Sequence, residues 1–508
     1  MFRFVHACTL EVTSTSVSLW DTSVWGDVRY AQSPETVASR AVSGKRSFPH
    51  TLLSRKGHRR AVSLRVYENV QCERLLIRSI LFQLDMKRAV AVIGLGYVGL
   101  PVACLCIEKG MDVYGADIDN KKLESIEKGI SPIDDPYLNK EVSRINGKIR
   151  LTNNVAVASK SSSTIIVCVP TPVDKNHLPE LSALKNACEG ISKGLQKNVL
   201  VVIESTIFPG TVEEIVLPIL KKSNVSFYLA HCPERIDPGN KKFTIKNIPR
   251  VVAGIDKEST KKAAEFYRDI IDAEITELGS VKAAEAAKIM ENTFRDINIA
   301  FVNEMAKSFD KAGIDIIEVI KAASTKPFSF MPHYPGAGVG GHCIAVDPYY
   351  LISKAKQLGF DHKFLSLARE INESMPSYTV ELLEQELKKI GKKPENAKVG
   401  VLGLAYKANV DDTRESPALK VISILKNKKA IVNIFDPYVK KQSNVKDLNE
   451  LLEKSDYLIL ATDHNEFRGM DLGKLRENNI KIVIDGRNCL DKEKIKNLGI
   501  LYHGIGRF

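Results

Sequence analysis

The segment from residue 89 to residue 117 constrains the fold more than any other part of the chain. An apolar run, AVAVI, leads into GLGYVG at residues 94–99, and an apolar helical segment follows. The three glycines have the spacing G-x-G-x-x-G, and Asp117 ends the next apolar run. Such glycines let the backbone approach a pyrophosphate, and the N-terminus of the following helix attracts its negative charge. The acid can accept hydrogen bonds from a ribose. We predict a dinucleotide-binding turn that takes NAD rather than NADP; the alternative is a tight turn without a ligand.

The same segment also has the length of a membrane span. Residues 89–107 include 19 residues without a charge, which is enough to cross a bilayer as a helix. Three glycines and Pro101 fall in its middle, however, and a buried strand, turn and helix explains the pattern better. We therefore expect no membrane association.

The rest of the chain has three parts. From Met86, short apolar runs alternate with helical segments, which indicates a parallel α/β sheet. Residues 280–313 lack an internal Gly or Pro and predict one long helix. After the break GKKPENAK at residues 391–398, apolar runs alternate with helices again. We predict an α/β fold with domains at 86–278, 279–392 (helical) and 393–508.

Residues 1–85 do not match this pattern. They are rich in Arg, Ser and Thr, whereas lysine predominates later in the chain, and they show little periodicity. Glu11, Asp21 and Asp27 argue against a mitochondrial targeting peptide, which is poor in acids. We interpret residues 1–85 as an extension outside the fold, with Met86 as a candidate start.

Charge and cysteine usage exclude several classes of protein. The net charge of +12 comes mostly from lysines scattered through helical segments, which indicates a solvated surface rather than a nucleic-acid site. The nine cysteines form no C-x-x-C pair, and no zinc-type spacing is present. We expect a cytoplasmic protein without a disulfide framework or a metal.

A second G-x-G-x-x-G occurs in PGAGVGGHCIAVDPYY, at residues 335–350. It follows a proline-rich stretch, and no acid-tipped strand comes after it. Its glycines more plausibly let the backbone fold around a ligand and expose Cys343, which has polar neighbours including Asp347. The alternative is a buried structural cysteine.

A nicotinamide cofactor and a thiol together suggest a particular reaction. An alcohol loses a hydride, the thiolate adds to the aldehyde, a second hydride leaves a thioester, and water releases an acid. The charged intermediates need a cation or an amide nearby. Glu285, Lys288, Asn292 and Arg295 form one polar stripe on the predicted long helix. On pattern alone, a solvated face explains this stripe better than a site for an anion does.

The chain resembles the UDP-sugar 6-dehydrogenase family, whose members act on UDP-glucose or on UDP-N-acetylhexosamines such as UDP-N-acetyl-D-mannosamine. The similarity runs from Met86 to the C-terminus and is carried by the motifs VIGLGYVGLP, CVPTP, ESTIFPGT, CPERIDPG, AAEAAKIMENTFRDINIAFVNE, GVGGHCIAVDP, GLAYKANVDDTRESPA, DPY and DGRN. It implies NAD-dependent four-electron oxidation of the sugar C6 hydroxyl. It also implies two Rossmann-like domains joined by a helical domain that forms a homodimer or a higher homo-oligomer.

The resemblance also implies site residues, matched motif by motif. Cys343 would be the nucleophile, with Asp347 activating water, Lys288 and Asn292 steadying the oxyanion, Lys288 also transferring protons, Thr206 positioning water or cofactor, and Glu234 assisting hydrolysis. The cofactor contacts would be Gly94, Gly96, Tyr97, Val98, Gly99, Asp117, Lys122, Thr171 and Thr206. The substrate contacts would be Arg235, Ile236, Lys288, Asn292, Arg295, Gly338, Tyr406, Lys407 and Arg414.

The motifs separate the sugars less clearly. GHCIAVDPYYL is similar to the branch that acts on UDP-N-acetylhexosamines, but TKPFSFMPHYP departs from the His-Pro-Arg pattern of many N-acetylmannosamine enzymes. We favour UDP-N-acetyl-D-mannosamine and keep UDP-N-acetylglucosamine and UDP-glucose as alternatives. Two rival functions are a two-electron hydroxyacid-type dehydrogenase, which needs no thiol, and an inactive nucleotide-sugar-binding protein.

Overall fold

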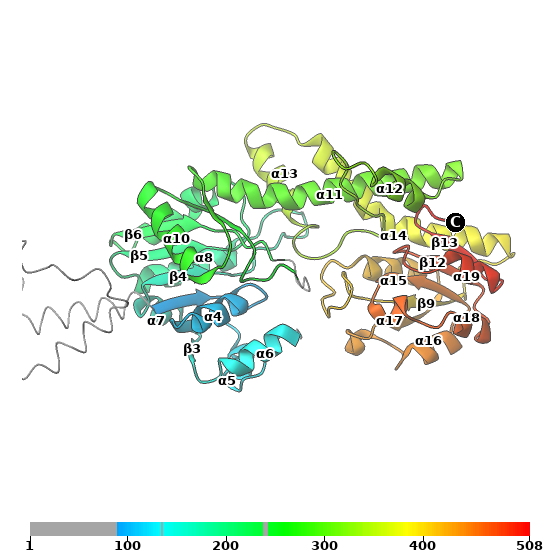
Figure 1. The fold of residues 1–508 in the computed structure, drawn as a ribbon, viewed down its shortest axis with the longest axis horizontal. Helices are drawn as coiled ribbons and strands as arrows, with labels where there is room; N and C mark the ends of the chain where they lie inside the picture. The colour runs from blue at the N-terminus through cyan, green and yellow to red at the C-terminus, as the bar shows by residue number, and fades with distance from the viewer. Residues whose placement is uncertain (1–88, 134–135, 237–241) are drawn as a thin grey trace, which may run out of the picture. The chain divides into compact units, whose positions relative to one another are not determined.

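The computed structural model describes residues 89–133, 136–236 and 242–508, so the predicted extension at residues 1–85 lies outside the described part of the chain. In the described ranges, a sheet of eight strands is followed by a helical region and then by a sheet of five strands (Figure 1). The predicted fold class, two α/β sheet domains with long helices between them in the sequence, is confirmed.

The first sheet has the order β3-β2-β1-β4-β5-β6-β7-β8, and every neighbouring pair is parallel except β6 and β7. The order reverses between β1 and β4, and ligands of such sheets bind at the carboxyl ends of the strands at this switch point. The strands are β1 (Ala89–Ile93), β2 (Asp112–Ala116), β3 (Ile149–Thr152), β4 (Thr164–Val167), β5 (Val199–Ile203), β6 (Phe227–His231), β7 (Arg250–Gly254) and β8 (Ile275–Glu277).

Helices cover both faces of this sheet. All five residues of β1 are buried, and its alternate side chains enter two different apolar clusters, one on each face. The helices are α4 (Gly99–Glu108), α5 (Asn120–Glu127), α6 (Pro136–Arg144), α7 (Val155–Lys160), α8 (Ser182–Gly194), the π-helix η1 (Val212–Val216), α9 (Leu217–Lys221) and α10 (Lys257–Ile270).

The middle region is helical, as its sequence predicts. Its first helix, α11, spans 32 residues, begins after Ser280 and ends at Gly313, which has the left-handed conformation of a helix C-cap. The helices are α11 (Val281–Ala312), α12 (Ile316–Ala323), α13 (Asp347–Gln357) and α14 (Lys363–Lys389). In the described ranges, no helix combines the length and apolarity that a membrane crossing requires.

The second sheet is fully parallel, with the order β10-β9-β11-β12-β13 and a switch point between β9 and β11. Its strands are β9 (Lys398–Leu402), β10 (Ile431–Phe435), β11 (Tyr457–Leu460), β12 (Ile482–Asp485) and β13 (Leu501–Gly504). The helices are α15 (Pro417–Asn427), η2 (Lys440–Gln442), α16 (Leu448–Glu453), α17 (Asn465–Arg468), α18 (Gly473–Glu477) and α19 (Lys492–Asn497).

Candidate active site

The glycine turn between β1 and α4 lies at the switch point of the first sheet. Gly94 has φ of +91°, and a Cβ there would lie 2.6 Å from the carbonyl oxygen of Cys168. A Cβ on Gly99 would lie 1.8 Å from the carbonyl oxygen of Gly94. Around Gly96, in contrast, no atom comes within 4 Å of that position. The first and third glycines are therefore required for packing, whereas the second leaves open space beside the start of α4, where a phosphate group fits.

Asp117 follows β2 and is tied to this turn. One of its carboxylate oxygens accepts the amide of Leu95 at 2.8 Å and the Lys122 ammonium at 2.7 Å, and the other accepts the amide of Asp119 at 3.0 Å. Burial raises the pKa of Asp117, but these hydrogen bonds outweigh it and hold the pKa below its usual range. The carboxylate stays charged at neutral pH, as an acceptor for ribose hydroxyls must.

Thr171 and Thr206 lie beyond the ends of β4 and β5. The Thr171 hydroxyl donates to the carbonyl oxygen of Thr206 at 2.6 Å, so these two predicted cofactor contacts lie side by side. The Tyr350 hydroxyl donates to the carbonyl oxygen of Thr171. Because Tyr350 belongs to α13, this contact joins the helix that begins at Asp347 to the first sheet domain.

Tyr97, within the glycine turn, contacts residues that follow β9 in the second α/β domain. Its hydroxyl donates to Asp411 at 3.3 Å, and the Arg414 guanidinium lies 5.2 Å from its ring centroid. Arg414 is in turn held by Asp412 through contacts of 2.5–3.0 Å. A predicted cofactor contact and a predicted substrate contact are thereby brought together. Val98, the next residue, precedes the first residue of α4.

The cysteine loop places Cys343 one turn before Asp347. The carbonyl oxygen of Cys343 accepts the amides of Val346 at 3.1 Å and Asp347 at 2.8 Å, so the two side chains lie on a single tight turn. The Asn292 amide group of α11 donates to the Asp347 carboxylate at 2.6 Å. Two segments that the sequence analysis joined only by resemblance are thus in direct contact.

Burial and the neighbouring charges shift both acidic groups of this turn. Burial raises the pKa of Asp347 to about 6, against the opposing effects of Lys288 and Asn292. Burial and the Asp347 charge raise the pKa of the half-buried Cys343 thiol to about 11, although Lys288 and Arg414 act to lower it. Without ligands the thiol is protonated at neutral pH, so it must lose its proton before it can act as a nucleophile.

The polar stripe of α11 is not a uniformly solvated face. Glu285 is fully buried and accepts the amides of Gly210 at 2.6 Å and Val212 at 2.8 Å, and burial raises its pKa to about 7. Lys288 is only 8% exposed. Asn292 is half-buried and Arg295 is exposed. The interpretation as a solvated face therefore holds only for the exposed end of the stripe, at Arg295.

Glu234 and Arg235 are already engaged by protein groups. One Glu234 oxygen accepts the amides of Arg235 and Ile236, both at 2.6 Å, and the other lies 2.5 Å from the buried Arg250 guanidinium. The Arg235 guanidinium pairs with Glu291 of α11 at 2.6 Å, and Ile236 packs against the apolar cluster of the first sheet. This geometry gives Glu234 a direct role in holding the backbone of residues 235 and 236.

The second glycine loop packs against the loop that follows β9, at the switch point of the second sheet. A Cβ on Gly341 would lie 2.8 Å from the Tyr406 ring, and the Gly341 amide donates to the carbonyl oxygen of Arg414 at 3.0 Å. Gly338 has φ of +134° and lies against Pro417. These glycines bring the cysteine loop close to the segment that holds Tyr406 and the half-buried Lys407. They form no strand–turn–helix of the dinucleotide-binding type.

Some contacts at the site could not be assigned from sequence. Arg487 of the DGRN motif donates to the carbonyl oxygens of Tyr406 at 2.9 Å and Ala461 at 3.0 Å, and it lies against Gly336. The motif was visible, but its partners are remote in the chain. Arg250 gave no signal beyond its place at the start of an apolar run.

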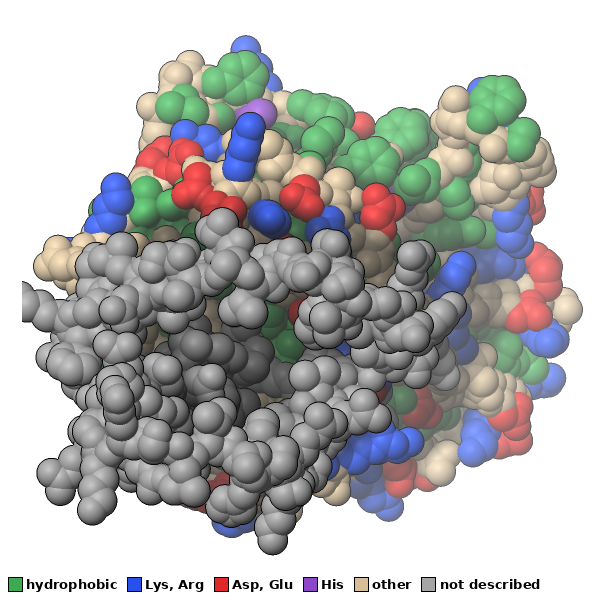
Figure 2. All heavy atoms as spheres, turned by 60° about the vertical axis from the view of Figure 1, so that its left-hand side comes forward, with side chains coloured by type: hydrophobic (Ala, Val, Ile, Leu, Met, Phe, Trp, Pro, Cys, Tyr) green, Lys and Arg blue, Asp and Glu red, His purple; other side chains and the backbone are tan. Residues whose placement is uncertain are grey.

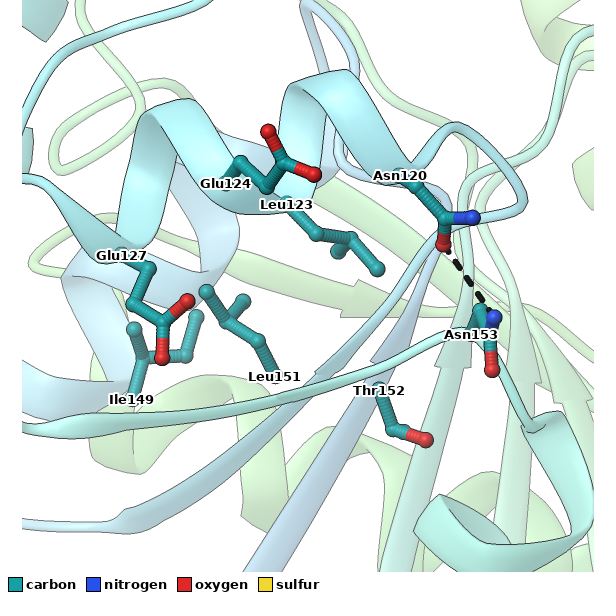
Figure 3. A pocket seen from close by; sticks show the side chains of 8 residues that line it. All are labelled: Asn120, Leu123, Glu124, Glu127, Ile149, Leu151, Thr152 and Asn153. Carbon is teal, nitrogen blue, oxygen red and sulfur yellow. Dashed lines mark hydrogen bonds between the residues drawn. The ribbon is translucent and has the colours of Figure 1, made fainter.

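A hollow between α5 and β3 lies next to Asp117, whose amide donates to the carbonyl oxygen of Thr152 in the lining at 3.3 Å. Figure 3 shows Asn120 hydrogen-bonded to Asn153 at 3.1 Å on one side and Glu124 and Glu127 on the other, above an apolar floor. None of the predicted site residues lines it. Its two carboxylates would repel a phosphate, and we do not assign it to the active site.

The combined geometry suits thiol-assisted oxidation. It provides an open glycine turn with a charged acid, a cysteine near a buried lysine, and an asparagine-held carboxylate beside that cysteine. The open space at Gly96 fits the pyrophosphate of a dinucleotide, and the ionised Asp117 fits its ribose hydroxyls.

Comparison with known proteins follows this division of the chain. Residues 88–271 match the NAD binding domain, residues 282–374 the central domain and residues 400–492 the UDP binding domain of the UDP-glucose/GDP-mannose dehydrogenase family.

Two curated relatives match over most of their length. A UDP-N-acetyl-D-mannosamine dehydrogenase of Pyrococcus horikoshii is 38% identical over 427 residues, covering 82% of this chain and 99% of the relative. A UDP-N-acetyl-D-glucosamine 6-dehydrogenase of Pseudomonas aeruginosa is 36% identical over 425 residues, covering 81% and 98%. A solved structure of the UDP-D-ManNAc dehydrogenase from Pyrococcus horikoshii has a TM-score of 0.77 at 38% identity, over 82% of this chain and 99% of that one.

Proposed function

Because the chain belongs to the UDP-glucose/GDP-mannose dehydrogenase family and is an NAD-dependent nucleotide-sugar 6-dehydrogenase, we propose that its substrate is UDP-N-acetyl-D-mannosamine. The product is then the corresponding uronate. Two relatives in different organisms carry the names of the mannosamine and the glucosamine enzymes at similar identity, so UDP-N-acetylglucosamine is the second candidate. UDP-glucose is the third.

The contact between Asn292 and Asp347 carries the mechanistic part of the proposal. It supports a catalytic centre made by α11 and the cysteine turn. Cys343 adds to the C6 aldehyde after losing its proton, and the resulting thiohemiacetal is oxidised to a thioester that water hydrolyses. NAD, when bound, accepts the hydride of each oxidation. Lys288 stabilises the anionic oxygen and takes up protons, assisted by the Asn292 amide. Asp347 orients and activates the water.

We assign the binding roles by the elements that carry each residue. The cofactor is held by Gly94, Gly96, Tyr97, Val98, Gly99, Asp117, Lys122, Thr171 and Thr206, and the substrate by Arg235, Ile236, Lys288, Asn292, Arg295, Gly338, Tyr406, Lys407 and Arg414. For Glu234 we propose an assisting role in hydrolysis through the backbone that it holds, since both of its oxygens are engaged. Thr206 positions water or cofactor.

We also propose the domain boundaries 86–278, 279–392 and 393–508 and a cytoplasmic location. The boundaries follow the gaps between β8 and α11 and between α14 and β9. The location is supported by the seven described cysteines, all of which are free.

We propose a homodimer or a higher homo-oligomer formed through α11. Met290 (72% exposed), Phe294 and Phe301 lie on one face of this helix, and exposed apolar side chains also gather over the helical region in Figure 2. Such a patch on a helix is typical of a protein interface. Phe294→Asp should reduce the sedimenting mass to that of one chain, and an unchanged mass would contradict this interface.

The substrate is tested by measuring NADH formation with UDP-N-acetylmannosamine, UDP-N-acetylglucosamine and UDP-glucose. We expect kcat/KM for the first to exceed the others by at least about tenfold. A higher kcat/KM for UDP-N-acetylglucosamine would replace the proposed sugar. No NADH with any of them would favour the inactive binding protein.

A further inference from the structure

A buried cation lies between two segments of the proposed site and has no role in the mechanism above. Arg250 is the first residue of β7 and is 1% exposed. Burying an arginine is costly unless acids compensate the charge. The groups that surround the Arg250 guanidinium therefore show which segments its charge joins.

Two buried carboxylates flank the Arg250 guanidinium. Its Nη2 atom lies 2.5 Å from Oε2 of Glu234, and its Nη1 atom lies 3.7 Å from Oε2 of Glu204. The Tyr267 hydroxyl donates to the other Glu204 oxygen at 2.5 Å, and the guanidinium lies 5.8 Å from the Tyr267 ring centroid. Glu204 is 1% exposed, and burial together with the repulsion of Glu234 raises its pKa, although Arg250 acts to lower it. Arg250 thus keeps two acids together that would otherwise repel each other.

Each carboxylate belongs to a segment with proposed ligand contacts. Glu204 immediately follows β5 and lies two residues before Thr206, the proposed cofactor contact. Glu234 holds the amides of Arg235 and Ile236, the proposed substrate contacts, on its second oxygen. A displacement of the Glu234 side chain therefore displaces the backbone of these two residues, because both amides are hydrogen-bonded to it at 2.6 Å.

A second contact joins the start of β7 to the same segment. The Arg235 guanidinium donates to the carbonyl oxygen of Pro249 at 3.2 Å, immediately before Arg250. Residues 249 and 250 therefore contact the segment 234–236 twice, through the Pro249 carbonyl oxygen and through the Arg250 side chain. A role limited to the stability of the sheet would not require this link to the segment.

We propose that Arg250 is a positioning residue for the sugar substrate. Its guanidinium fixes residues 234–236 relative to residues 204–206, and so sets where the UDP-sugar lies with respect to the cofactor. This inference rests on the proposed function, and it adds a residue that touches neither ligand.

The test uses a charge-compensated variant. Arg250→Met alone leaves two adjacent buried acids, so it is combined with Glu204→Gln, and Glu204→Gln alone serves as its reference. We expect the double variant to melt at a lower temperature than the reference, because the buried Glu234 loses its cation, but to keep its NAD affinity, measured by calorimetry, within twofold. The KM for the UDP-sugar should rise about tenfold, with a smaller change in kcat. Arg250→Lys, which keeps the charge but loses the fork, should give an intermediate KM.

A matched control removes another partly buried cation from an ion pair. Lys492 of α19 pairs with Asp315 at 2.7 Å and lies outside the proposed site, so Lys492→Met should lower the melting temperature and leave both KM values unchanged. The proposal is overturned if the double variant has a KM for the UDP-sugar within twofold of that of Glu204→Gln. It is also overturned if the NAD affinity of the double variant falls by the same factor as its KM for the UDP-sugar rises. If the double variant does not fold, Arg250→Lys decides, and an unchanged sugar KM there overturns it. Absence of turnover by the wild-type enzyme contradicts the proposed function instead.

Discussion

At the scale of single residues, sequence and structure contribute different information about Cys343. The sequence distinguishes it from the other cysteines by its glycine loop and polar neighbours, and the structure finds it half-buried whereas Cys104, Cys106, Cys168, Cys188 and Cys232 are buried. Its protonation state could not be predicted, because it depends on burial and on Asp347 and Lys288, which the fold brings near. The burial of Glu285 could not be predicted either, because the spacing of residues on a helix does not show which other segments cover that helix.

The protonation of Cys343 gives the first prediction. Burial raises the pKa of this thiol to about 11, so its alkylation by iodoacetamide in the unliganded enzyme should rise about tenfold per pH unit from pH 7 to pH 10 without a plateau. Because Lys288 lowers this pKa, Lys288→Met should slow alkylation further at every pH. Mass spectrometry of the peptide, with Cys343→Ser as the background, measures the rate. A plateau near pH 8.5 would refute this description of the site.

At the scale of elements, long and strongly patterned segments were predicted well. In the first sheet, the predicted strands AVAVIG, DVYGAD, STIIVCVP, VLVVIES, SFYLAH and RVVAG correspond to β1, β2, β4, β5, β6 and β7. In the second sheet, KVGVLGLAY, AIVNIFD, YLILATD and IKIVIDGR correspond to β9–β12, and the predicted long helix corresponds to α11. The short strands β3, β8 and β13 were not predicted. β3 and β8 lie at sheet edges, where β3 (IRLT) has no fully buried residue and β8 (ITE) has one. Such strands lack the apolar run that marks a buried strand.

The glycine turn separates packing from cofactor binding. A Cβ at residue 99 would meet the backbone at 1.8 Å, so Gly99→Ala should lower both the melting temperature and the NAD affinity. A Cβ at residue 96 meets only open space, so Gly96→Ala should leave the melting temperature unchanged and weaken NAD binding about tenfold by intruding on the phosphate. Calorimetric titration and thermal melts measure both. Unchanged NAD affinity in Gly96→Ala would place the pyrophosphate elsewhere.

β13 is joined to α11 and α14 through His503. Its ring nitrogens lie 2.9 Å from Asp310 and 2.8 Å from Glu386, and although burial lowers the pKa of His503, the two acids outweigh it and raise the pKa to about 9. The stabilisation is complete below the unfolded pKa of about 6.5 and is lost as the pH rises through about 9.

His503→Gln should therefore cost roughly 2 kcal/mol of unfolding free energy at pH 7 and little at pH 10. Urea unfolding of both proteins at the two pH values measures this difference. An equal loss at pH 7 and pH 10 would show that the imidazolium charge is not what joins these elements.

At the scale of the whole molecule, the two G-x-G-x-x-G copies have different surroundings. The first forms a strand–turn–helix at the switch point of the first sheet, and the second packs the cysteine loop against Tyr406. Sequence context predicted this difference, since only the first copy follows an apolar strand and is itself followed by a strand that ends in an acid. The contacts between remote segments, such as Tyr97 with Arg414, could not be predicted, because local patterns contain no information about which loops meet.

We propose that one thiol, that of Cys343, carries the sugar through two successive oxidations at this site. It is tested by counting NADH formed per UDP-sugar consumed at completion, with the product identified by mass. We expect two NADH per sugar and a carboxylate product, with Cys343→Ser forming none of the acid. One NADH per sugar, or full acid formation by Cys343→Ser, would contradict it.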